Sequence, residues 1–355
     1  MKFHHDKETP NLKTVFFKKN IHKLKKIKKT LIISGGSRNG NHLIWSLLDG
    51  NNDIPYLPGE DKFLSRIFWR NLKSSREFEY NLKKTKSSFL RKLSGLRSNK
   101  WIKIYNEKYN KKIWAGKHKP TVMPLLEFPE SENKINYPAY KKYLDKNFKN
   151  KFSFYEIWDL YLNAQKLLAN KNKKKHKYQF IYAESGLRRE LLYLAENRFN
   201  FICLVPVRKF ETFYFSKIKS IFNSTKINKK YIDEAWGHWY NKTSDYLYLK
   251  NKFPKKFLLI PYEDFSNFKT REKSIKKVCK FLKIKFNKIN LINTHYKKEV
   301  MPNTSFLKKV KLIKDKKVDI DGYSTYKNLN YEFPLNKIPK NYFDFYNNLK
   351  KFFYK

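Results

Sequence analysis

The sequence predicts an α/β fold in which helices flank an open parallel β-sheet and one helical region is inserted. Short apolar segments of strand length alternate along the 355-residue chain with segments whose apolar residues repeat at helical spacing. Residues 199–207 form a nearly continuous apolar run, as expected for a strand buried on both faces of a parallel sheet. Residues 30–44 pass from an apolar strand through a glycine-rich turn into an amphipathic helix.

The expected strands and helices alternate, and ligands bind such sheets at the carboxyl ends of the strands. The long helix near residue 240 carries four large aromatic side chains, which we expect to lie in the core: Trp236, Trp239, Tyr240 and Tyr246. Strands are expected at residues 30–34, 178–183, 199–207 and 256–261, and helices at residues 41–48, 154–169, 187–196, 211–221, 229–250 and 274–282.

The chain length suits one large domain with an insertion. We interpret residues 1–29 as a basic lead-in and residues 30–355 as a single α/β domain. Within that domain, residues 65–150 are rich in lysine and aromatic residues but have weak periodicity. We interpret this stretch as a helical insertion that serves as a lid or binds an acceptor.

The formal net charge of +48 is extreme, and it has two readings. It can indicate an acidic partner such as nucleic acid, anionic lipid or acidic polysaccharide. It can also reflect an A/T-rich genome, because Lys, Asn, Ile, Phe and Tyr are abundant together. We favour the second reading because the lysines are spread along the whole chain, and we expect no specific nucleic-acid partner.

The two cysteines, Cys203 and Cys279, lie in apolar or helical runs and are expected to be buried thiols in a reducing cytoplasm. Their spacing is not that of metal ligands, so no metal is expected. The first thirty residues contain no apolar stretch long enough for a signal peptide or membrane anchor. Residues 20–29 could form a basic helix on the inner membrane surface, giving weak peripheral association, although a solvated lead-in is favoured.

The glycine-rich turn after the first strand is a candidate anion site. Backbone N–H groups face inward in such turns, and the helix that follows has partial positive charge at its N-terminus. Gly35 and Gly40 have the spacing of a phosphate loop, but Asn41 and His42 stand where that motif has Lys and Ser/Thr. With Arg38 as its charged donor, the loop is suited to phosphate and poorly suited to magnesium-dependent ATP chemistry.

A second candidate anion site follows the third strand. Arg208 comes directly after that strand, and Ser216 lies eight positions later on the next expected helix. An arginine at a strand end can hold a phosphate through two hydrogen bonds, although it often only forms an ion pair. Because a phosphate-type loop comes earlier in the same chain, we favour phosphate binding for Arg208.

These segments together resemble the sulfotransferase family, which transfers sulfuryl groups from 3′-phosphoadenosine 5′-phosphosulfate (PAPS). Residues 37–43 are similar to the family's 5′-phosphosulfate loop, and residues 204–216 to its 3′-phosphate motif with the same Arg-to-Ser interval. Residues 258–265 are similar to its Tyr-Glu-Asp-Leu strand, followed by a matching helix segment at 278–282, and residues 303–306 to a C-terminal Asn-Ser-Ser-Phe loop. The resemblance spans about residues 30–306 and leaves the insertion unmatched.

The resemblance implies the three-layer fold of P-loop NTPases and PAPS as co-substrate, without metal. Arg208 and Ser216 would bind the 3′-phosphate, and Tyr262-Glu263-Asp264 would support the nucleotide side. The acceptor would be a hydroxyl or amine, with a glycan or other carbohydrate favoured, because the glycine-and-lysine loop of cytosolic small-molecule enzymes is not evident. The 5′-phosphosulfate would be held by Gly36, Ser37, Arg38, Asn39, Gly40, Asn41, His42 and Leu43, with Asn41 and His42 donating in place of two threonine hydroxyls.

The family uses a His or Glu to take the acceptor's proton. Glu60 is favoured here, and Glu184, His42 and His118 are further candidates. For each carboxylate a salt bridge is the simpler role in so lysine-rich a chain. Arg38 would stabilise the negative charge that develops during transfer. Two other functions stay open: a nucleotide-binding kinase or NTPase on a similar loop, and a non-enzymatic binder of anionic polymers or membranes.

Overall fold

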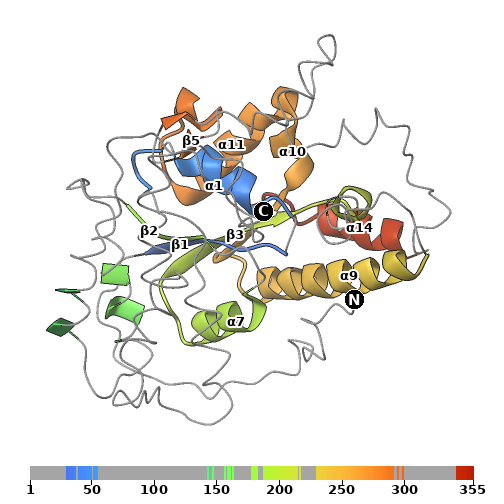
Figure 1. Cartoon of the computed structure of the whole chain (residues 1–355), viewed down its shortest axis with the longest axis horizontal. Coiled ribbons are helices and arrows are strands. Elements are labelled where there is room, and N and C mark those ends of the chain that lie inside the picture. The colour runs from blue at the N-terminus through green and yellow to red at the C-terminus, as the bar shows by residue number, and fades with distance from the viewer. Residues whose placement is uncertain are drawn as a thin grey trace, which may run out of the picture.

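The computed structural model confirms the α/β architecture (Figure 1). Several expected features, among them the insertion and the 303–306 loop, lie wholly or mostly outside the residues that the structure describes. The structure describes residues 29–36, 39–49, 51–54, 177–182, 187–214, 216, 229–291, 294–295, 298–299 and 341–355, and also the helical residues 142–143, 146–147, 156, 158–160 and 162–163.

Four parallel strands form the central sheet in the order β2-β1-β3-β4. Every residue of β1, β3 and β4 is buried, which explains their continuous apolar sequences. The chain passes from β1 to one neighbour, β2, and then to the other, β3, so the strand order reverses between β1 and β3. This reversal is where open α/β sheets bind ligands. The strands are β1 (Thr30–Ile33), β2 (Gln179–Tyr182), β3 (Phe201–Val207) and β4 (Phe257–Pro261).

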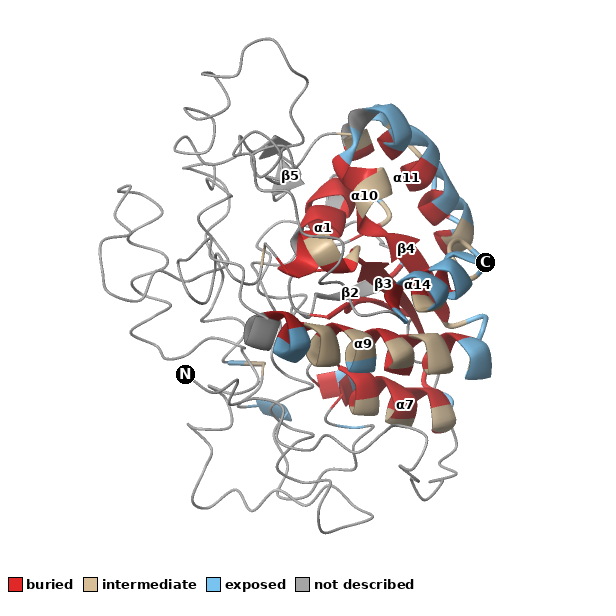
Figure 2. Ribbon diagram, turned by 90° about the vertical axis from the view of Figure 1, so that its right-hand side faces the viewer, coloured by how far each residue is buried: buried red, intermediate tan, exposed pale blue. Residues whose placement is uncertain are grey.

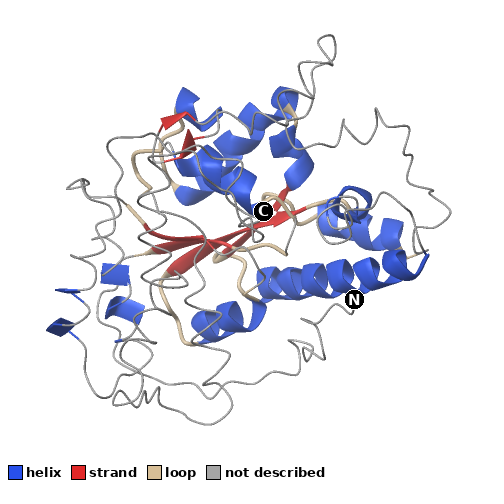
Figure 3. Ribbon diagram, viewed as in Figure 1, coloured by secondary structure: helices blue, strands red, loops and turns tan. Residues whose placement is uncertain are grey.

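Helices cover both faces of the sheet, as the sequence predicts (Figure 3). One face carries α1 (Asn41–Asp49), α10 (Tyr262–Ser266) and α11 (Phe268–Leu282), and the other carries α7 (Arg188–Glu196) and α9 (Lys229–Lys252). The last helix, α14 (Tyr342–Lys350), packs aromatic rings against α9. A short 3-10 helix, η3 (Lys288–Leu291), precedes a small antiparallel pair, β5 (Thr294–His295) and β6 (Lys298–Glu299).

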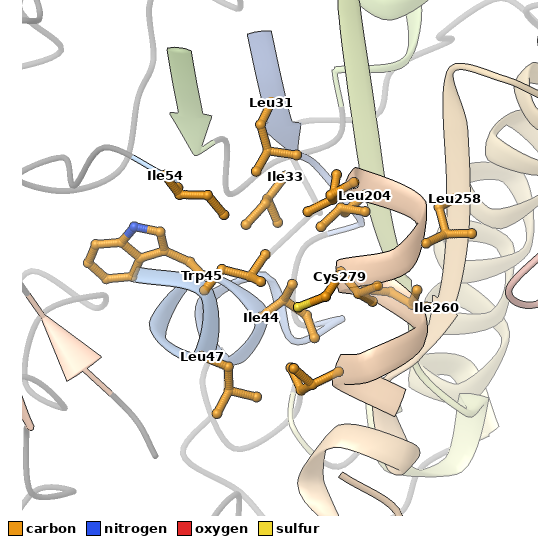
Figure 4. Close-up of a cluster of buried hydrophobic side chains, with 14 of the residues drawn as sticks. Leu31, Ile33, Ile44, Trp45, Leu47, Ile54, Leu204, Leu258, Ile260 and Cys279 are labelled. Carbon is orange, nitrogen blue, oxygen red and sulfur yellow. The ribbon is translucent and has the colours of Figure 1, made fainter. Parts of the chain in front are cut away.

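The core lies between the sheet and the helices that cover it (Figure 2). On the α1 side, Leu31 and Ile33 of β1 meet Ile44 and Trp45 of α1 and Cys279 of α11 (Figure 4). Burial of a large apolar side chain contributes about 1.5–3 kcal/mol, so this cluster anchors α1 and the loop before it to the sheet.

Both cysteines are buried, as expected, and burial raises the pKa of the Cys279 thiol to about 12. On the expected aromatic helix, Trp239 and Tyr246 are buried, whereas Trp236 and Tyr240 are only half-buried. In the part of the chain that the structure describes, no helix is long and apolar enough to cross a membrane.

The largest boundary difference concerns α11, which begins at Phe268 rather than at residue 274. Its first turns are polar and show no apolar repeat, but the Asn267 side chain accepts a hydrogen bond from the Lys269 N–H and caps the helix. The helix ends at Leu282, and the next residue, Lys283, adopts a left-handed conformation with φ 55°. Helices α10 and α14 were not among the expected elements.

Candidate functional site

The loop after β1 is pressed against the end of β3. The backbone N–H of Ser34 donates to the carbonyl of Leu204, with an N···O distance of 3.0 Å. A Cβ atom added to Gly35 would stand 2.5 Å from the carbonyl oxygen of Pro206. The loop can lie this close to β3 only because position 35 has no side chain.

Gly40, at the other end of the loop, has both a conformational and a steric reason to be glycine. Its φ of +92° lies in a region that L side chains rarely adopt. A Cβ atom there would stand 2.1 Å from Cδ2 of Tyr262, the first residue of α10. The Tyr262 ring therefore rests directly on the backbone at the point where the loop becomes α1.

The side chain of Asn41 clamps the loop from within. Its Oδ1 accepts a hydrogen bond from the Gly35 N–H at 2.7 Å, and its Nδ2 approaches the carbonyl oxygens of Gly35 and Gly36 at 3.4 and 3.5 Å. We expect this amide to donate to phosphate, and that role stays a prediction. In this structure the same side chain holds the loop backbone.

The neighbouring residues of the loop differ in what they offer a ligand. The N–H of Asn39 closes a turn onto the carbonyl of Gly36 at 3.1 Å. The Asn39 side chain is 3% exposed, and its Oδ1 has no hydrogen-bond partner among the described residues. Leu43 is buried in the core, so it can offer only its backbone N–H. Ser37, Arg38 and the His42 side chain lie outside what the structure describes.

The bend after β3 is built from buried polar side chains rather than from glycine. Arg208 is 5% exposed, and its Nε donates to Oγ1 of Thr212 at 3.1 Å. Its backbone carbonyl accepts a hydrogen bond from Nε1 of Trp239 on α9 at 2.8 Å. The guanidinium carbon lies 4.1 Å from the centre of the Tyr262 ring, in a cation–π contact. Together these contacts hold the backbone and the guanidinium of Arg208 in place.

Glu263 supports the same bend. Its Oε1 accepts hydrogen bonds from the Lys209 N–H at 2.8 Å and from the Thr212 hydroxyl at 3.0 Å. Burial raises the pKa of the Glu263 carboxyl, while the Lys209 hydrogen bond and the Arg208 charge oppose that rise. Glu263 thus positions Arg208 through Thr212, in the supporting role expected of the Tyr-Glu-Asp segment.

Tyr262 joins the two bends. One part of its ring contacts Gly40 in the loop after β1, and the Arg208 guanidinium lies over the same ring. The sequence predicts two anion sites at the carboxyl ends of two strands. In the structure, the backbone of one and the arginine of the other both lie against the Tyr262 ring. Ser216 lies half-buried on the helix that begins at Phe210.

Comparisons with known proteins agree with this architecture. No protein-family model and no curated protein matches the sequence. Among solved structures, the sulfotransferase domain from the Synechococcus PCC 7002 olefin synthase is similar, with a TM-score of 0.50 at 14% identity over 94% of this chain and 98% of that chain. The chain has a sulfotransferase fold. The sulfotransferase domain from the curacin biosynthetic pathway gives a TM-score of 0.47 at 15% identity over 92% and 99% of the two chains.

Three candidates for the proton acceptor lie outside the described part of this sulfotransferase fold. They are Glu60, Glu184 and His118, and their assignment stays a prediction. For His42 the structure describes only the backbone, in the first turn of α1. Residue 42 directly follows the anion loop in the chain, and its role as the base stays a prediction.

Helix α9 contributes residues that sequence reasoning missed. Lys242 lies beside the loop, with its Cδ 3.8 Å from the position of a Cβ on Gly36, and its Nζ is 2.9 Å from Nε2 of His238. One turn further on, the hydroxyl of Tyr246 is 3.1 Å from that of Ser34, at the end of β1. The four-residue spacing of positions 238, 242 and 246 is a sequence signal that could have identified this face of the helix.

A buried ion pair joins α9 to α7. The guanidinium of Arg188 on α7 pairs with the Asp245 carboxylate on α9, and both residues are buried. The N–H of Leu187 donates to the Ser34 hydroxyl at 3.2 Å. Burial raises the pKa of the Tyr246 hydroxyl, which keeps it neutral within this network. The network links α7, α9 and the end of β1.

Proposed function

We propose that this protein is a sulfotransferase that moves a sulfuryl group from PAPS to a hydroxyl or amine acceptor. The observation that carries the proposal is the meeting of the two bends at Tyr262, where Gly40 contacts the ring and the Arg208 guanidinium lies over it. One doubly phosphorylated adenosine could then contact both bends. The sulfotransferase fold supports the same function.

The residues present are suited to such a donor. Gly35 and Gly40 bring loop backbone close to its neighbours without side chains, and the N-terminus of α1 favours negative charge. The loop from Gly36 to Leu43, including Arg38, would hold the 5′-phosphosulfate. Arg208 and Ser216 would hold the 3′-phosphate and so select PAPS over nucleotides that lack it.

Sulfuryl transfer places negative charge on the peripheral and leaving-group oxygens, and fixed donors and cations stabilise that charge. The acceptor oxygen or nitrogen forms the new bond to sulfur while the bond from sulfur to the 5′-phosphate oxygen breaks. The electron pair of the broken bond stays on the phosphate, and the acceptor's proton passes to a base, for which we favour Glu60. The products are the sulfated acceptor and 3′-phosphoadenosine 5′-phosphate (PAP).

For the acceptor we propose a glycan or another carbohydrate, by analogy with the carbohydrate branch of the family. The insertion at residues 65–150 is the candidate acceptor-binding segment. A panel of oligosaccharides, simple alcohols and amines, assayed with PAPS, tests this assignment. Sulfation of a phenol in preference to every sugar would refute the carbohydrate proposal and leave the sulfotransferase proposal standing.

Isothermal titration with PAP tests the function itself. We expect PAP to bind more tightly than AMP, and Arg208→Ala to weaken PAP binding about 10- to 150-fold, since a hydrogen bond to a charged group contributes about 1.5–3 kcal/mol. Arg198→Ala is the matched control. Arg198 is exposed and precedes β3, so it lies at the opposite end of that strand from Arg208.

Two results would replace the proposal. Absence of PAP binding together with magnesium-dependent ATP turnover would favour a kinase or NTPase. Retention on DNA at high salt without nucleotide binding would favour an anionic-polymer binder.

A further inference from the structure

The loop after β1 lacks a lysine in its own sequence, because Asn41 stands where a phosphate loop has one. Fold and packing bring a lysine to the same place from a distant part of the chain. Lys242 lies near the middle of α9, and its Cδ is 3.8 Å from the position of a Cβ on Gly36. The side-chain stem therefore runs alongside the loop backbone that would face the donor's 5′ group.

His238 orients this lysine. Its Nε2 is 2.9 Å from Nζ of Lys242, one helical turn away. An ammonium can only donate, so Nε2 is the acceptor in this contact. The His238 ring also stacks on the ring of Phe213, which is nearly parallel at 16° with centroids 6.0 Å apart.

Phe213 belongs to the helix that begins after Arg208, so the pair is tied to both bends. Lys242 lies beside the loop after β1, and the His238 ring stacks on Phe213 in the segment after β3. Both side chains are half-buried, which leaves them accessible to a ligand while α9 holds their backbone in place. Trp239, which donates a hydrogen bond to the Arg208 carbonyl, is on α9 as well. The rotation of α9 about its axis therefore sets all these contacts together.

We propose that Lys242 is a catalytic residue whose ammonium contacts the donor's 5′-phosphosulfate, and that His238 is the positioning residue that directs it there. The inference rests on the proposed sulfotransferase function. In the transfer, the bond between sulfur and the bridging oxygen breaks and its electron pair stays on the 5′-phosphate oxygen. A fixed ammonium beside that oxygen stabilises the charge as it develops, and needs no proton transfer of its own.

Fragments of the donor separate the two ends of the site. Lys242→Met should weaken binding of PAP and of 5′-AMP at least about tenfold, and leave binding of 3′-AMP unchanged, because 3′-AMP has no 5′ group. Arg208→Ala should give the opposite pattern, weakening PAP and 3′-AMP but not 5′-AMP. Competition calorimetry against PAP measures the weak ligands.

Turnover provides the second measurement. The rate constant for the conversion of PAPS to PAP should fall about 10²- to 10³-fold in Lys242→Met. This is the loss expected when one preorganised donor to a developing charge is removed. Lys242→Arg should recover part of it. Lys252→Met is the matched control, because Lys252 is on the same helix but pairs with Glu196, about 15 Å further along the axis.

Two substitutions of His238 separate its roles. His238→Gln retains an acceptor for Lys242, whereas His238→Phe retains the stacking on Phe213 but cannot accept. The Phe variant should weaken 5′-AMP binding about 2- to 10-fold, and the Gln variant should restore it. A purely structural role would make both variants fail equally and lower 3′-AMP binding as well.

Failure of the inference differs from failure of the proposed function. If wild-type protein binds PAP more tightly than AMP but Lys242→Met binds PAP and turns over PAPS like wild type, the role of Lys242 is refuted and the sulfotransferase stands. If wild-type protein does not bind PAP, both are refuted. Thermal unfolding of Lys242→Met, His238→Gln and His238→Phe checks that these variants are folded.

Discussion

The two bends that meet at Tyr262 are built in different ways. The loop after β1 is a backbone structure, in which two glycines allow close approach and Asn41 clamps the loop internally. The bend after β3 is a side-chain structure, in which Arg208 is held by Thr212 and Thr212 by Glu263. A site made of backbone N–H groups can bind an anion with many sequences, whereas a site made of side chains depends on particular residues.

The difference fits the way each bend compares with the sulfotransferase pattern that the sequence resembles. Asn41 and His42 replace two hydroxyl residues in the backbone-built loop, and the loop still closes because an amide can bond to its own backbone. The Arg208-to-Ser216 interval is retained in the side-chain-built bend. Each of the following substitutions breaks or sharpens this contrast.

The largest effect is expected at Gly40. Gly40→Ala adds a Cβ 2.1 Å from the Tyr262 ring at a residue whose φ is +92°, so it combines a clash with backbone strain. We expect the free energy of unfolding to fall by about 3 kcal/mol or more, measured by urea denaturation. Gly237→Ala is the control, because open space surrounds that helical glycine and alanine there should stabilise by about 0.5–1 kcal/mol.

A paired comparison of moderate effect uses Asn41→Ala and Thr212→Val. Each removes an internal hydrogen-bonding group from one bend and should lower the free energy of unfolding by about 1–3 kcal/mol, because a buried polar group loses its partner. Asn41→Ala should weaken 5′-AMP binding, and Thr212→Val should weaken 3′-AMP binding. Equal losses for both ligands in either variant would mean that the two bends do not act separately.

The smallest effect is a pH dependence at Glu263. Its pKa is raised in the folded protein, so between the unfolded and folded pKa values the folded state binds more protons. The stability that this group contributes is therefore present at low pH and is lost as pH rises through the folded pKa. Glu263→Gln retains the oxygen that accepts from Lys209 but cannot ionise.

Urea denaturation of Glu263→Gln and wild type at a series of pH values from about 4 upward measures this dependence. The stability of the glutamine variant relative to wild type should rise with pH across that window. A difference that stays constant with pH would contradict the raised pKa. The corresponding alanine variant should be less stable at every pH, because the Lys209 N–H loses its acceptor.

Local sequence patterns were sufficient to predict the four strands and their order along the chain, since buried parallel strands read as apolar runs of characteristic length. Boundaries were less accurate where a cap rather than an apolar repeat starts a helix, as Asn267 does for α11. Helix α14 was missed because its place depends on aromatic contacts with α9, about a hundred residues earlier.

At the site, the glycine loop and Arg208 were predictable because each has a local signature: close glycine spacing and an arginine at the end of a buried strand. The internal role of the Asn41 amide was not predictable, because an asparagine side chain can bond to a ligand or to its own loop with equal chemistry.

By itself, the sequence determined the parallel α/β architecture, the glycine turn after β1 and the charged residue after β3. These follow from side-chain periodicity and from backbone conformations that only certain residues adopt. Only the tertiary structure decided that Tyr262 joins Gly40 to Arg208, that Lys242 lies beside the loop after β1 and that His238 contacts Lys242. Contacts between residues far apart in the chain depend on strand order and on the rotation of α9 about its axis, and packing of the whole core sets both.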